Sequence, residues 1–390
     1  MKIAIVGFGI TGAALAVLLS RRGVTVELFE QSTVVGPVGA GILLQPVGQQ
    51  VLSAMGLLDE AVQHAEKITE IRVRTHRGHQ LVHLRYDEWT PGLCAYGLHR
   101  GRLFEALRKT LAATSTLTHL NTRILKCDSQ DYGATLIDAQ GNIFGPFDWV
   151  FGCDGGNSTM LQVSSLKFRD YKYTCGALWY IGRTERIRGH LFQATKGTQR
   201  LCGLLPTGHG ECSFFWGATA EEAHSIRSDF DKWKVEALRI FPESEEILSD
   251  LQGPSALLFT TWRHRNLPHC VNGRLLLMGD AAHASSPHLG QGVNLGLLDA
   301  WVFDQIFGQC GNWAEAANHY AKRRQRHRSF YAELTYLLSP FFQSTHNVLS
   351  FPRDVALPLL NSIPLFRRQM ISVLTGMRYD WWGGTYKLHL

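Results

Sequence analysis

Residues 2–12 of this chain read KIAIVGFGITG and decide how its first half folds. The run from Ile3 to Val6 is short and wholly apolar, which is typical of a buried strand in a parallel sheet. The glycines that follow have separate tasks: Gly7 permits a tight turn, Gly9 lets the backbone approach a diphosphate, and Gly12 lets the next helix pack on the strand. The stretch therefore predicts the opening of a nucleotide-binding unit.

The next two expected elements complete a strand–helix–strand unit. A helix over residues 13–22 directs its free amide groups and positive dipole end at the phosphates. A strand over residues 24–29 then ends in Glu30, 18 residues after Gly12, where an acidic side chain accepts hydrogen bonds from a ribose. A lone glycine fingerprint is a weak signal, and a chance cluster is the alternative. The complete order of strand, turn, helix, strand and acid favours a dinucleotide site.

A second cluster lies far along the chain, at residues 274–283, RLLLMGDAAH. Its apolar strand ends at Gly279, so Asp280 is expected just beyond the carboxyl end of a central strand. A carboxylate in that position accepts hydrogen bonds from the hydroxyls of a polyol chain. This cluster predicts that the nucleotide is a flavin dinucleotide.

The loop after Asp280 has the composition of a segment that borders a flat ring. A proline turns the chain, two glycines bring the backbone close to the ring, and the following helix directs its amino end at a reduced flavin, whose negative charge it stabilises. The alternative, a packing corner, explains the glycines but not the aspartate, proline and asparagine together. The loop residues expected to contact the cofactor are Pro287, Gly290, Gln291, Gly292, Val293 and Asn294.

A third cluster, residues 148–158, reads DWVFGCDGGNS. A strand ends there at Asp154, which Gly155 follows, and this would put a carboxylate at the carboxyl edge of the sheet. Ligands bind at that edge in doubly wound folds. On this segment alone, an ordinary Asp-Gly turn is an equally good interpretation.

The remaining segments predict how the nucleotide site is covered. A chain of 390 residues, 45% hydrophobic, has room for two or three structural units. We expect an α/β fold in which a Rossmann-like FAD-binding domain carries an inserted antiparallel β-sheet for substrate and a helical C-terminus. The expected boundaries are 1–70, 99–171 and 271–330 for the FAD-binding domain, 71–98 and 172–270 for the substrate sheet, and 331–390 for the helical region.

Composition limits the other function classes. The net charge of +6 suits anionic cofactors and substrates but is too diffuse to indicate nucleic-acid binding. Eight cysteines without a paired short spacing favour reduced thiols in a cytoplasmic protein over disulfides or a zinc site, so no metal is expected. The first apolar run is a strand and not a signal peptide, and no stretch reaches the ~18 apolar residues of a transmembrane helix. A monomer or a homodimer is expected.

Together these pieces resemble the single-component, FAD-dependent aromatic hydroxylases, the flavoprotein monooxygenases typified by para-hydroxybenzoate and salicylate hydroxylases. The matching motifs span residues 1 to about 330: GFGITG at 7–12, Glu30, HRGRL at 99–103, CDG at 153–155, and the segment 279–292. The resemblance implies that Glu30 holds the adenosine ribose and that Arg100 lies beside the diphosphate and ribityl chain. It also implies that Asp280 binds the ribityl hydroxyls and that Pro287, Gly290 and Gly292 border the isoalloxazine ring. The motif of Asp154 and Gly155 is tied to both FAD and NAD(P)H. The other implied FAD contacts are Gly7, Gly9, Thr11, Gly12 and Gly279.

The resemblance also implies a reaction. NADPH or NADH binds transiently and reduces FAD, O₂ adds to the reduced ring, and the resulting C4a-hydroperoxide hydroxylates or epoxidises an aromatic or conjugated small molecule. Water must be kept from this species, and the aromatic residues of the inserted sheet are candidates for a dry wall. For each of them, plain core packing is the alternative. They are Trp179, Phe214, Trp216 and Trp262.

One position departs from the family pattern. Leu161 stands seven residues after Asp154, where family members usually carry arginine, and this weakens the expected docking of NAD(P)H. Leu161 therefore gives some weight to an FAD-dependent oxidase or dehydrogenase on the same fold. A flavin-containing binding protein without turnover is a separate alternative. The sequence does not choose a catalytic base among His83, His209, His283 and His288.

The segment 322–328, KRRQRHR, is a basic run on an expected long helix over residues 313–338. We interpret it as a solvated helix face, two members of which, Arg324 and His327, fall on the apolar stripe and are covered by the C-terminal tail. Contact with anionic lipid is the alternative.

Overall fold

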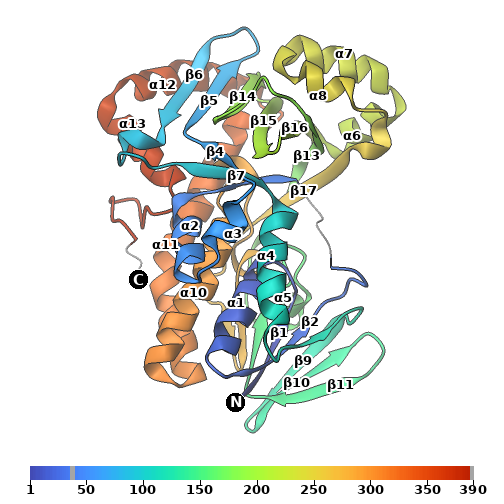
Figure 1. The fold of residues 1–390 in the computed structure, drawn as a ribbon, viewed down its shortest axis with the longest axis vertical. Coiled ribbons are helices and arrows are strands. Elements are labelled where there is room, and N and C mark those ends of the chain that lie inside the picture. Colours follow the sequence, from blue (N-terminus) through green and yellow to red (C-terminus); the bar gives the residue numbers. More distant parts are fainter. Residues whose placement is uncertain (36–39, 387–390) are drawn as a thin grey trace.

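The fold is described from a computed structural model of residues 1–35 and 40–386. It has two tiers, a mostly parallel sheet with its helices below and a larger sheet with its own helices above (Figure 1). Residues 36–39 and 387–390, which belong to the predicted segments 1–70 and 331–390, lie outside the described residues.

The lower tier is built on a six-stranded sheet in the order β18-β19-β12-β1-β2-β8. β1 is parallel to β2 and to β12, and β12 is parallel to β19. Because parallel strands end at the same edge of a sheet, the segments after β1, β12 and β19 emerge side by side. The bounds are β1 Lys2–Val6, β2 Thr25–Phe29, β8 Leu117–His119, β12 Trp149–Gly152, β18 Val271–Asn272 and β19 Leu275–Leu277.

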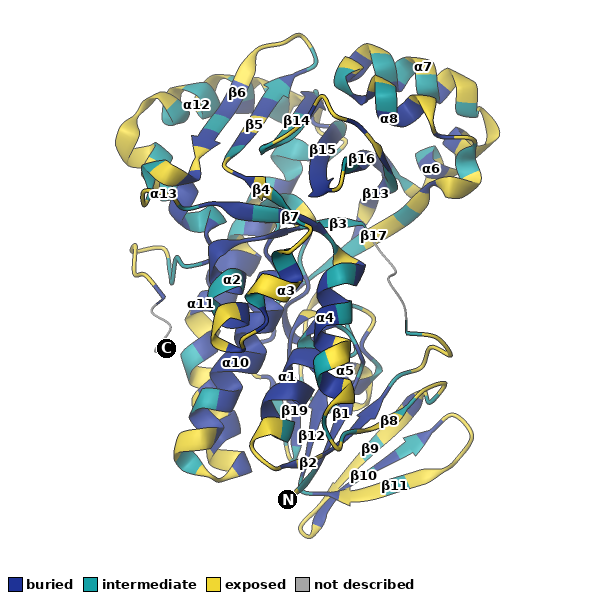
Figure 2. Ribbon diagram, in the orientation of Figure 1, coloured by how far each residue is buried: buried dark blue, intermediate teal, exposed yellow. Residues whose placement is uncertain are grey.

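Helices flank this sheet, and together with its strands they enclose the main apolar core, dark blue in Figure 2. α1 packs on both α10 and α4, and α10 in turn packs on α2 and α11. α11 runs beyond the expected end at 338 and contains Pro340 in its last turn. The bounds are α1 Ile10–Arg21, α2 Pro46–Ala54, α3 Leu58–Val62, α4 Arg100–Ala112, α5 Thr159–Val163, α9 Asp280–His283, α10 Gly292–Cys310 and α11 Trp313–Phe342.

The upper tier is a seven-stranded sheet in the order β17-β13-β16-β15-β14-β5-β6. Its pairs are antiparallel, as the sequence predicts, except that β5 enters from the first part of the chain and lies parallel to β14. The bounds are β5 Glu70–Thr75, β6 Gln80–Arg85, β13 Asp170–Arg183, β14 His190–Lys196, β15 Arg200–Gly208, β16 Glu211–Thr219 and β17 Leu258–Arg265.

Two groups of helices cover the upper sheet (Figure 1). The first group consists of three short helices, and a capping box formed by Thr219 and Glu222 starts the first of them. The second group packs on β6 and forms the helical C-terminus that the sequence predicts. The bounds are α6 Ala220–Ser228, α7 Phe230–Ile240, α8 Glu245–Ser249, α12 Ser350–Ser362 and α13 Pro364–Leu374.

A small sheet in the order β3-β7-β4 contacts the upper sheet through β15. β7 and β15 lie so close together that a Cβ atom at Gly97 would be 2.0 Å from the carbonyl oxygen of Pro206. Only glycine therefore fits at this position. A separate three-stranded sheet of β9, β10 and β11 lies beside the N-terminus. The bounds are β3 Gly41–Leu44, β4 Glu66–Ile68, β7 Ala95–His99, β9 Ile124–Gln130, β10 Gly133–Asp138 and β11 Ile143–Phe147.

All eight cysteines carry free thiols. Within residues 1–35 and 40–386, no helix has both the length and the apolar character needed to cross a bilayer. The domain boundaries given above stay a prediction.

Candidate functional site

The glycine turn after β1 is shaped by close backbone contacts. Gly7 has a φ of 105°, and a Cβ atom there would lie 2.4 Å from the carbonyl oxygen of Cys153. At Gly12 a Cβ atom would lie 2.1 Å from the carbonyl oxygen of Gly7, whereas at Gly9 it would meet no atom within 4 Å. The protein's own packing thus requires Gly7 and Gly12, while Gly9 leaves open space beside the amino end of α1.

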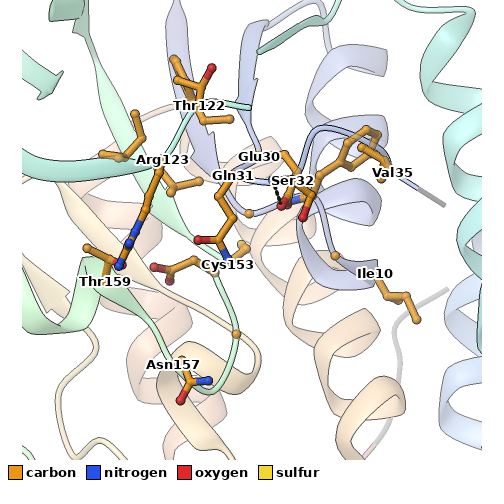
Figure 3. A pocket seen from close by; sticks show the side chains of 18 of the residues that line it. Ile10, Glu30, Gln31, Ser32, Val35, Thr122, Arg123, Cys153, Asn157 and Thr159 are labelled. Carbon is orange, nitrogen blue, oxygen red and sulfur yellow. Dashed lines mark hydrogen bonds between the residues drawn. The ribbon is translucent and has the colours of Figure 1, made fainter. Parts of the chain in front are cut away.

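A cavity of about 440 Å³ opens at this edge of the sheet (Figure 3). It brings together several predicted residues from four separate segments of the chain. It also contains residues that the sequence did not single out, because no motif marks them. The predicted lining residues are Gly7, Gly9, Glu30, Arg100, Asp154 and Gly155, and the additional ones include Gln31, Ser32, Arg123, Asn157 and Thr159.

Glu30 stands at the end of β2 with both carboxylate oxygens oriented by backbone. Its Oε2 accepts a hydrogen bond from the Phe8 N–H and its Oε1 one from the Ser32 N–H, each 2.9 Å long. Figure 3 shows Glu30 and Ser32 side by side in the cavity wall. A carboxylate oxygen has a second lone pair, so Glu30 retains the capacity to bind a ligand hydroxyl.

Two arginines supply positive charge to the cavity. The side chains of Arg100, at the start of α4, and of Arg123 are exposed. Neither guanidinium is hydrogen-bonded to, or ion-paired with, another residue within 1–35 and 40–386. Such cations suit an anionic group such as a diphosphate.

Asp154 follows β12, and the structure supports both interpretations of its Asp-Gly turn. Its Oδ1 accepts a hydrogen bond from the Ser158 hydroxyl (2.6 Å) and its Oδ2 one from the Met160 N–H (2.9 Å), so it stabilises the start of α5 while it lines the cavity. Burial raises the pKa of Asp154, although these hydrogen bonds oppose the shift. Leu161 lies in α5 and is buried in the main apolar core.

The Asp280 loop follows β19, and Thr11 of α1 joins it to the glycine turn. A Cβ atom at Gly279, whose φ is 58°, would lie 2.7 Å from Thr11 Oγ1, and one at Gly296 in α10 would lie 2.3 Å from the same atom. Asp280 is exposed, and a Cβ atom at Gly292 would lie 3.8 Å from its Oδ1. The two predicted cofactor segments therefore meet at one edge of the sheet, although about 270 residues separate them.

Two predicted loop residues use their side chains to hold the protein together. Asn294 is fully buried: its amide donates to the carbonyl oxygens of Leu43 (3.1 Å) and Gly290 (2.9 Å), and its Oδ1 accepts from the Gln45 N–H (2.9 Å). The Gln291 amide donates to the Leu374 carbonyl oxygen at 2.8 Å. The Asn294 side chain thus joins the start of α10 to β3 and to the Gly290 loop. Pro287 is exposed, and Gly290 adopts a φ of 62°.

Beneath the Asp280 loop lies a buried polar network that the sequence did not reveal. Asp299 of α10 accepts hydrogen bonds from the Gly279 N–H (3.0 Å), from His283 Nε2 (2.5 Å) and from Arg324 Nε (2.8 Å). Burial alone would raise the pKa of Asp299, but the charges and hydrogen bonds of His283 and Arg324 hold it well below its usual range. The network fixes the backbone immediately before Asp280.

The C-terminal tail closes this network. Arg324 donates to His327 Nδ1, and His327 Nε2–H donates to the Gly376 carbonyl oxygen (3.0 Å). The Arg324 guanidinium also lies 5.7 Å from the ring centre of Tyr386. The predicted covering of Arg324 and His327 is thus confirmed. A third member of the basic run, Arg328, is also buried, beside Cys270.

The predicted aromatic wall divides between the two faces of the upper sheet. Phe214 and Trp216 are fully buried and pack on Trp233 of α7, so the packing alternative is correct for both. Trp179 lies on the opposite face beside Phe215, with its Nε1–H donated to the Thr260 hydroxyl (2.8 Å). Trp262 is half-buried. Phe215, which the sequence did not single out, belongs with Trp179.

The four candidate histidines occupy different environments. His83 lies 2.5 Å from a Glu70 carboxylate oxygen in the β5–β6 hairpin, and His209 is exposed on the β15–β16 turn. His283 is bound to Asp299. Of the four, only His288 lies in the loop between α9 and α10, where the sequence places the flavin ring.

One group of side chains has the composition of a metal site. Ligand atoms of Cys310, Glu315 and His319, at the turn from α10 to α11, lie within 4.8 Å of one another. None of these residues lines the cavity. The absence of a metal from the function stays a prediction.

Comparison with known proteins relates this geometry to flavoproteins. A family model described as "FAD binding domain" matches residues 1–330. The kynurenine 3-monooxygenase of Myxococcus xanthus (strain DK1622) is 28% identical over 366 residues, covering 85% of this chain and 76% of that protein. The salicylate hydroxylase of Pseudomonas putida is 26% identical, covering 83% of this chain and 82% of that protein.

Solved structures resemble the whole fold. Klebsiella pneumoniae HpxO, complexed with FAD and uric acid, superimposes with a TM-score of 0.81 at 17% identity, covering 96% of this chain and 97% of that one. At this identity the likeness concerns the fold alone.

Proposed function

The chain belongs to the FAD binding domain family and is an FAD-dependent oxidoreductase, and on that basis we propose that it is a monooxygenase. It would insert one atom of O₂ into an aromatic or conjugated small molecule, with NADPH or NADH as electron donor. When bound, FAD supplies the redox chemistry by taking two electrons from the nicotinamide and passing them to O₂. The relatives named above support this assignment through their own substrates, kynurenine and salicylate.

The observation that carries the proposal is the meeting of the glycine turn and the Asp280 loop at Thr11. A dinucleotide longer than the cavity would extend from Glu30 past the amino end of α1 toward Asp280. The open space at Gly9 and the unpartnered cations at the cavity fit a diphosphate. The residues present therefore fit FAD.

We assign the protein's own groups as follows. Arg100 and the amino end of α1 bind the diphosphate, Glu30 the adenosine ribose, and Asp280 the ribityl hydroxyls. The backbone at the amino end of α10 faces the ring, where its N–H groups stabilise negative charge. The remaining proposed contacts are Gly7, Gly9, Thr11, Gly12, Asp154, Gly155, Gly279, Pro287, Gly290, Gln291, Gly292, Val293 and Asn294.

The upper sheet would exclude water from the reacting atoms. We propose that segments 71–98 and 172–270 form the substrate domain and that Trp179, Phe215 and Trp262 line its inner side. Aromatic rings there would keep the site dry and stack on a flat substrate. A cytoplasmic location and a monomeric or homodimeric state stay part of the proposal, and the cysteine pattern of the sequence supports the former.

Leu161 favours a second candidate function. An arginine is absent at this position, and the surrounding core is apolar, so docking of a nicotinamide has lost one expected group. An FAD-dependent oxidase or dehydrogenase that needs no NAD(P)H would tolerate this loss.

The test starts from the purified protein reconstituted with FAD. A monooxygenase oxidises NADPH or NADH faster when salicylate, 3-hydroxybenzoate or 4-hydroxyquinoline is added, and ¹⁸O from ¹⁸O₂ appears in the product. An oxidase instead shows flavin bleaching by the aromatic compound alone under anaerobic conditions. A protein that binds no FAD would contradict both proposals.

A further inference from the structure

Three side chains that carry metal-binding atoms meet at the turn from α10 to α11. Cys310 is the last residue of α10, and Glu315 and His319 lie four residues apart near the start of α11, on one face of that helix. Their ligand atoms all lie within 4.8 Å of one another. Nowhere else in the part of the chain that the structure describes do three cysteine, histidine or acidic side chains converge in this way.

The backbone of this turn is held in place by the protein itself. Gly311 adopts a φ of 66° and reverses the chain after α10. The Asn312 side-chain oxygen then accepts a hydrogen bond from the Glu315 N–H (3.0 Å) and so caps α11. The Trp313 ring stacks on Phe307 of α10, with ring centres 3.9 Å apart. The positions from which the three side chains extend are therefore fixed before any ion binds.

The sulfur and nitrogen ligands already have the spacing that a zinc ion requires. Cys310 Sγ lies 3.8 Å from His319 Nδ1. A tetrahedral zinc ion, with bonds of about 2.3 Å to sulfur and about 2.0–2.1 Å to nitrogen, holds these two atoms about 3.6 Å apart. The exposed side chain of Glu315 can rotate to bring a carboxylate oxygen to the third position.

The ligands are also accessible and chemically suited to zinc. Glu315 and His319 are exposed and Cys310 is half-buried, so an ion can enter from solvent and a water molecule can complete its coordination. Glu315 forms no ion pair with any residue in 1–35 or 40–386, so no cation competes for its carboxylate. Thiolate, imidazole and carboxylate are the ligands of protein-bound Zn²⁺, whereas Mg²⁺ and Ca²⁺ prefer oxygen ligands alone.

We propose that Cys310, Glu315 and His319 bind one Zn²⁺ ion, with water as the fourth ligand. On binding, the S–H bond of Cys310 breaks, its electron pair forms the bond to zinc, and the proton passes to solvent. His319 coordinates through Nδ1, the ring nitrogen that faces the sulfur. No oxidant or reductant is needed.

The inference goes beyond the proposed function and does not depend on it. None of the three residues lines the cavity, so the zinc ion takes no part in the oxygenation, for which no metal is expected. Its role is structural: it joins the end of α10 to the start of α11, two helices that Asp299 and Arg324 also join. An ion that binds only the folded turn stabilises the folded protein.

Calorimetric titration of the FAD-reconstituted, fully reduced protein with ZnCl₂ tests the ligand set. The wild-type protein should bind one Zn²⁺, and Cys310→Ser and His319→Gln should each weaken this binding by at least about tenfold. The matched controls are Cys127→Ser, at another cysteine that is not fully buried, and His224→Gln, at an exposed histidine of α6. Both should retain the wild-type affinity, and equal affinities in all four variants would overturn the proposal.

Cd²⁺ provides a spectroscopic probe of the sulfur ligand. Adding it to the wild-type protein should produce an ultraviolet charge-transfer band from thiolate to metal. The band should be absent in Cys310→Ser and present in Cys127→Ser. A band that persists without the Cys310 thiol would place the ion elsewhere and overturn the proposal.

Alkylation by iodoacetamide, mapped by mass spectrometry, compares two cysteines within one molecule. Zn²⁺ should slow the alkylation of Cys310 by at least about tenfold, because a coordinated thiolate is a poorer nucleophile, and should leave Cys127 unchanged. His319→Gln should abolish this protection. Equal protection of both cysteines, or protection that appears only when Zn²⁺ dimerises the protein in sedimentation, would overturn the site within one chain.

The outcome for zinc is separate from the outcome for the flavin. Cys310→Ser should bind FAD as tightly as the wild-type protein, since Cys310 lies outside the cavity. A wild-type protein that binds Zn²⁺ at this turn but no FAD would contradict the proposed function and leave the zinc site standing.

Discussion

The glycine turn and the Asp280 loop face the same proposed cofactor but are held in opposite ways. The turn is made of backbone: Gly7 and Gly12 are in place because nothing larger fits between adjacent strands and helix. The loop is held by buried side chains from other elements, chiefly Asp299 and Arg324. A local motif thus specifies one end of the site, and long-range polar contacts specify the other.

The largest effect is expected at the glycine turn. Gly12→Ala places a Cβ atom 2.1 Å from the Gly7 carbonyl oxygen, and we expect a loss of about 3 kcal/mol or more in the free energy of unfolding. Urea unfolding monitored by circular dichroism measures it.

Gly9→Ala is the matched control, because its Cβ atom meets no protein atom within 4 Å. It should change the stability of the FAD-free protein by less than about 0.5 kcal/mol and weaken FAD binding. Equal stabilities of the two variants would show that the contrast between these glycines is wrong.

A comparable effect is expected beneath the Asp280 loop. Asp299→Ala leaves Arg324 buried without its carboxylate and should lower the free energy of unfolding by about 3–5 kcal/mol. It should also weaken FAD binding, since the Gly279 N–H loses its acceptor. If the folded fraction of the variant bound FAD as tightly as the wild-type protein, the network would not be what positions the Asp280 loop.

The same network predicts a pH dependence. Because the folded-state pKa of Asp299 is lowered, its stabilising contribution is complete above the unfolded-state pKa of about 3.9 and is lost as the pH falls below that value. The difference in unfolding free energy between wild type and Asp299→Asn should therefore be constant above about pH 5 and shrink toward pH 3. If the difference in unfolding free energy instead grew as the pH fell, the assigned role of the Asp299 carboxylate would be contradicted.

The smallest of these effects is expected at the C-terminal tail. Tyr386→Ala removes the ring beside Arg324 and should cost about 1–2 kcal/mol, the size of a desolvated cation–π contact with its packing. Trp382→Ala, at a side chain that is 94% exposed, should cost less than about 0.5 kcal/mol. Thermal unfolding of both variants provides the comparison.

This contrast also explains what the sequence can predict. The strand, the glycines and Glu30 lie within thirty residues, so their spacing predicts their arrangement. No sequence motif marks Asp299, because its role depends on hydrogen bonds from groups in other segments. These groups are the Gly279 N–H, His283 and Arg324. The parallel β5–β14 pair was missed for the same reason.

The alternation of side chains along a strand was also not enough to predict which aromatic residues face the substrate side. The sequence marked Phe214 and Trp216 as aromatic, but the face of β16 that meets the substrate side depends on where α7 packs. The four candidate histidines could not be told apart for the same reason, because His283 is bound to Asp299 of another element, a contact that no local pattern reveals.

The central claim is that Glu30 and Asp280 hold opposite ends of one FAD, and calorimetric titration with ADP and FAD tests it directly. Glu30→Gln should weaken both ligands by about tenfold, whereas Asp280→Ala should weaken FAD by about tenfold and leave ADP unchanged. Equal losses of ADP affinity in both variants, or unchanged FAD affinity in Asp280→Ala, would contradict the claim.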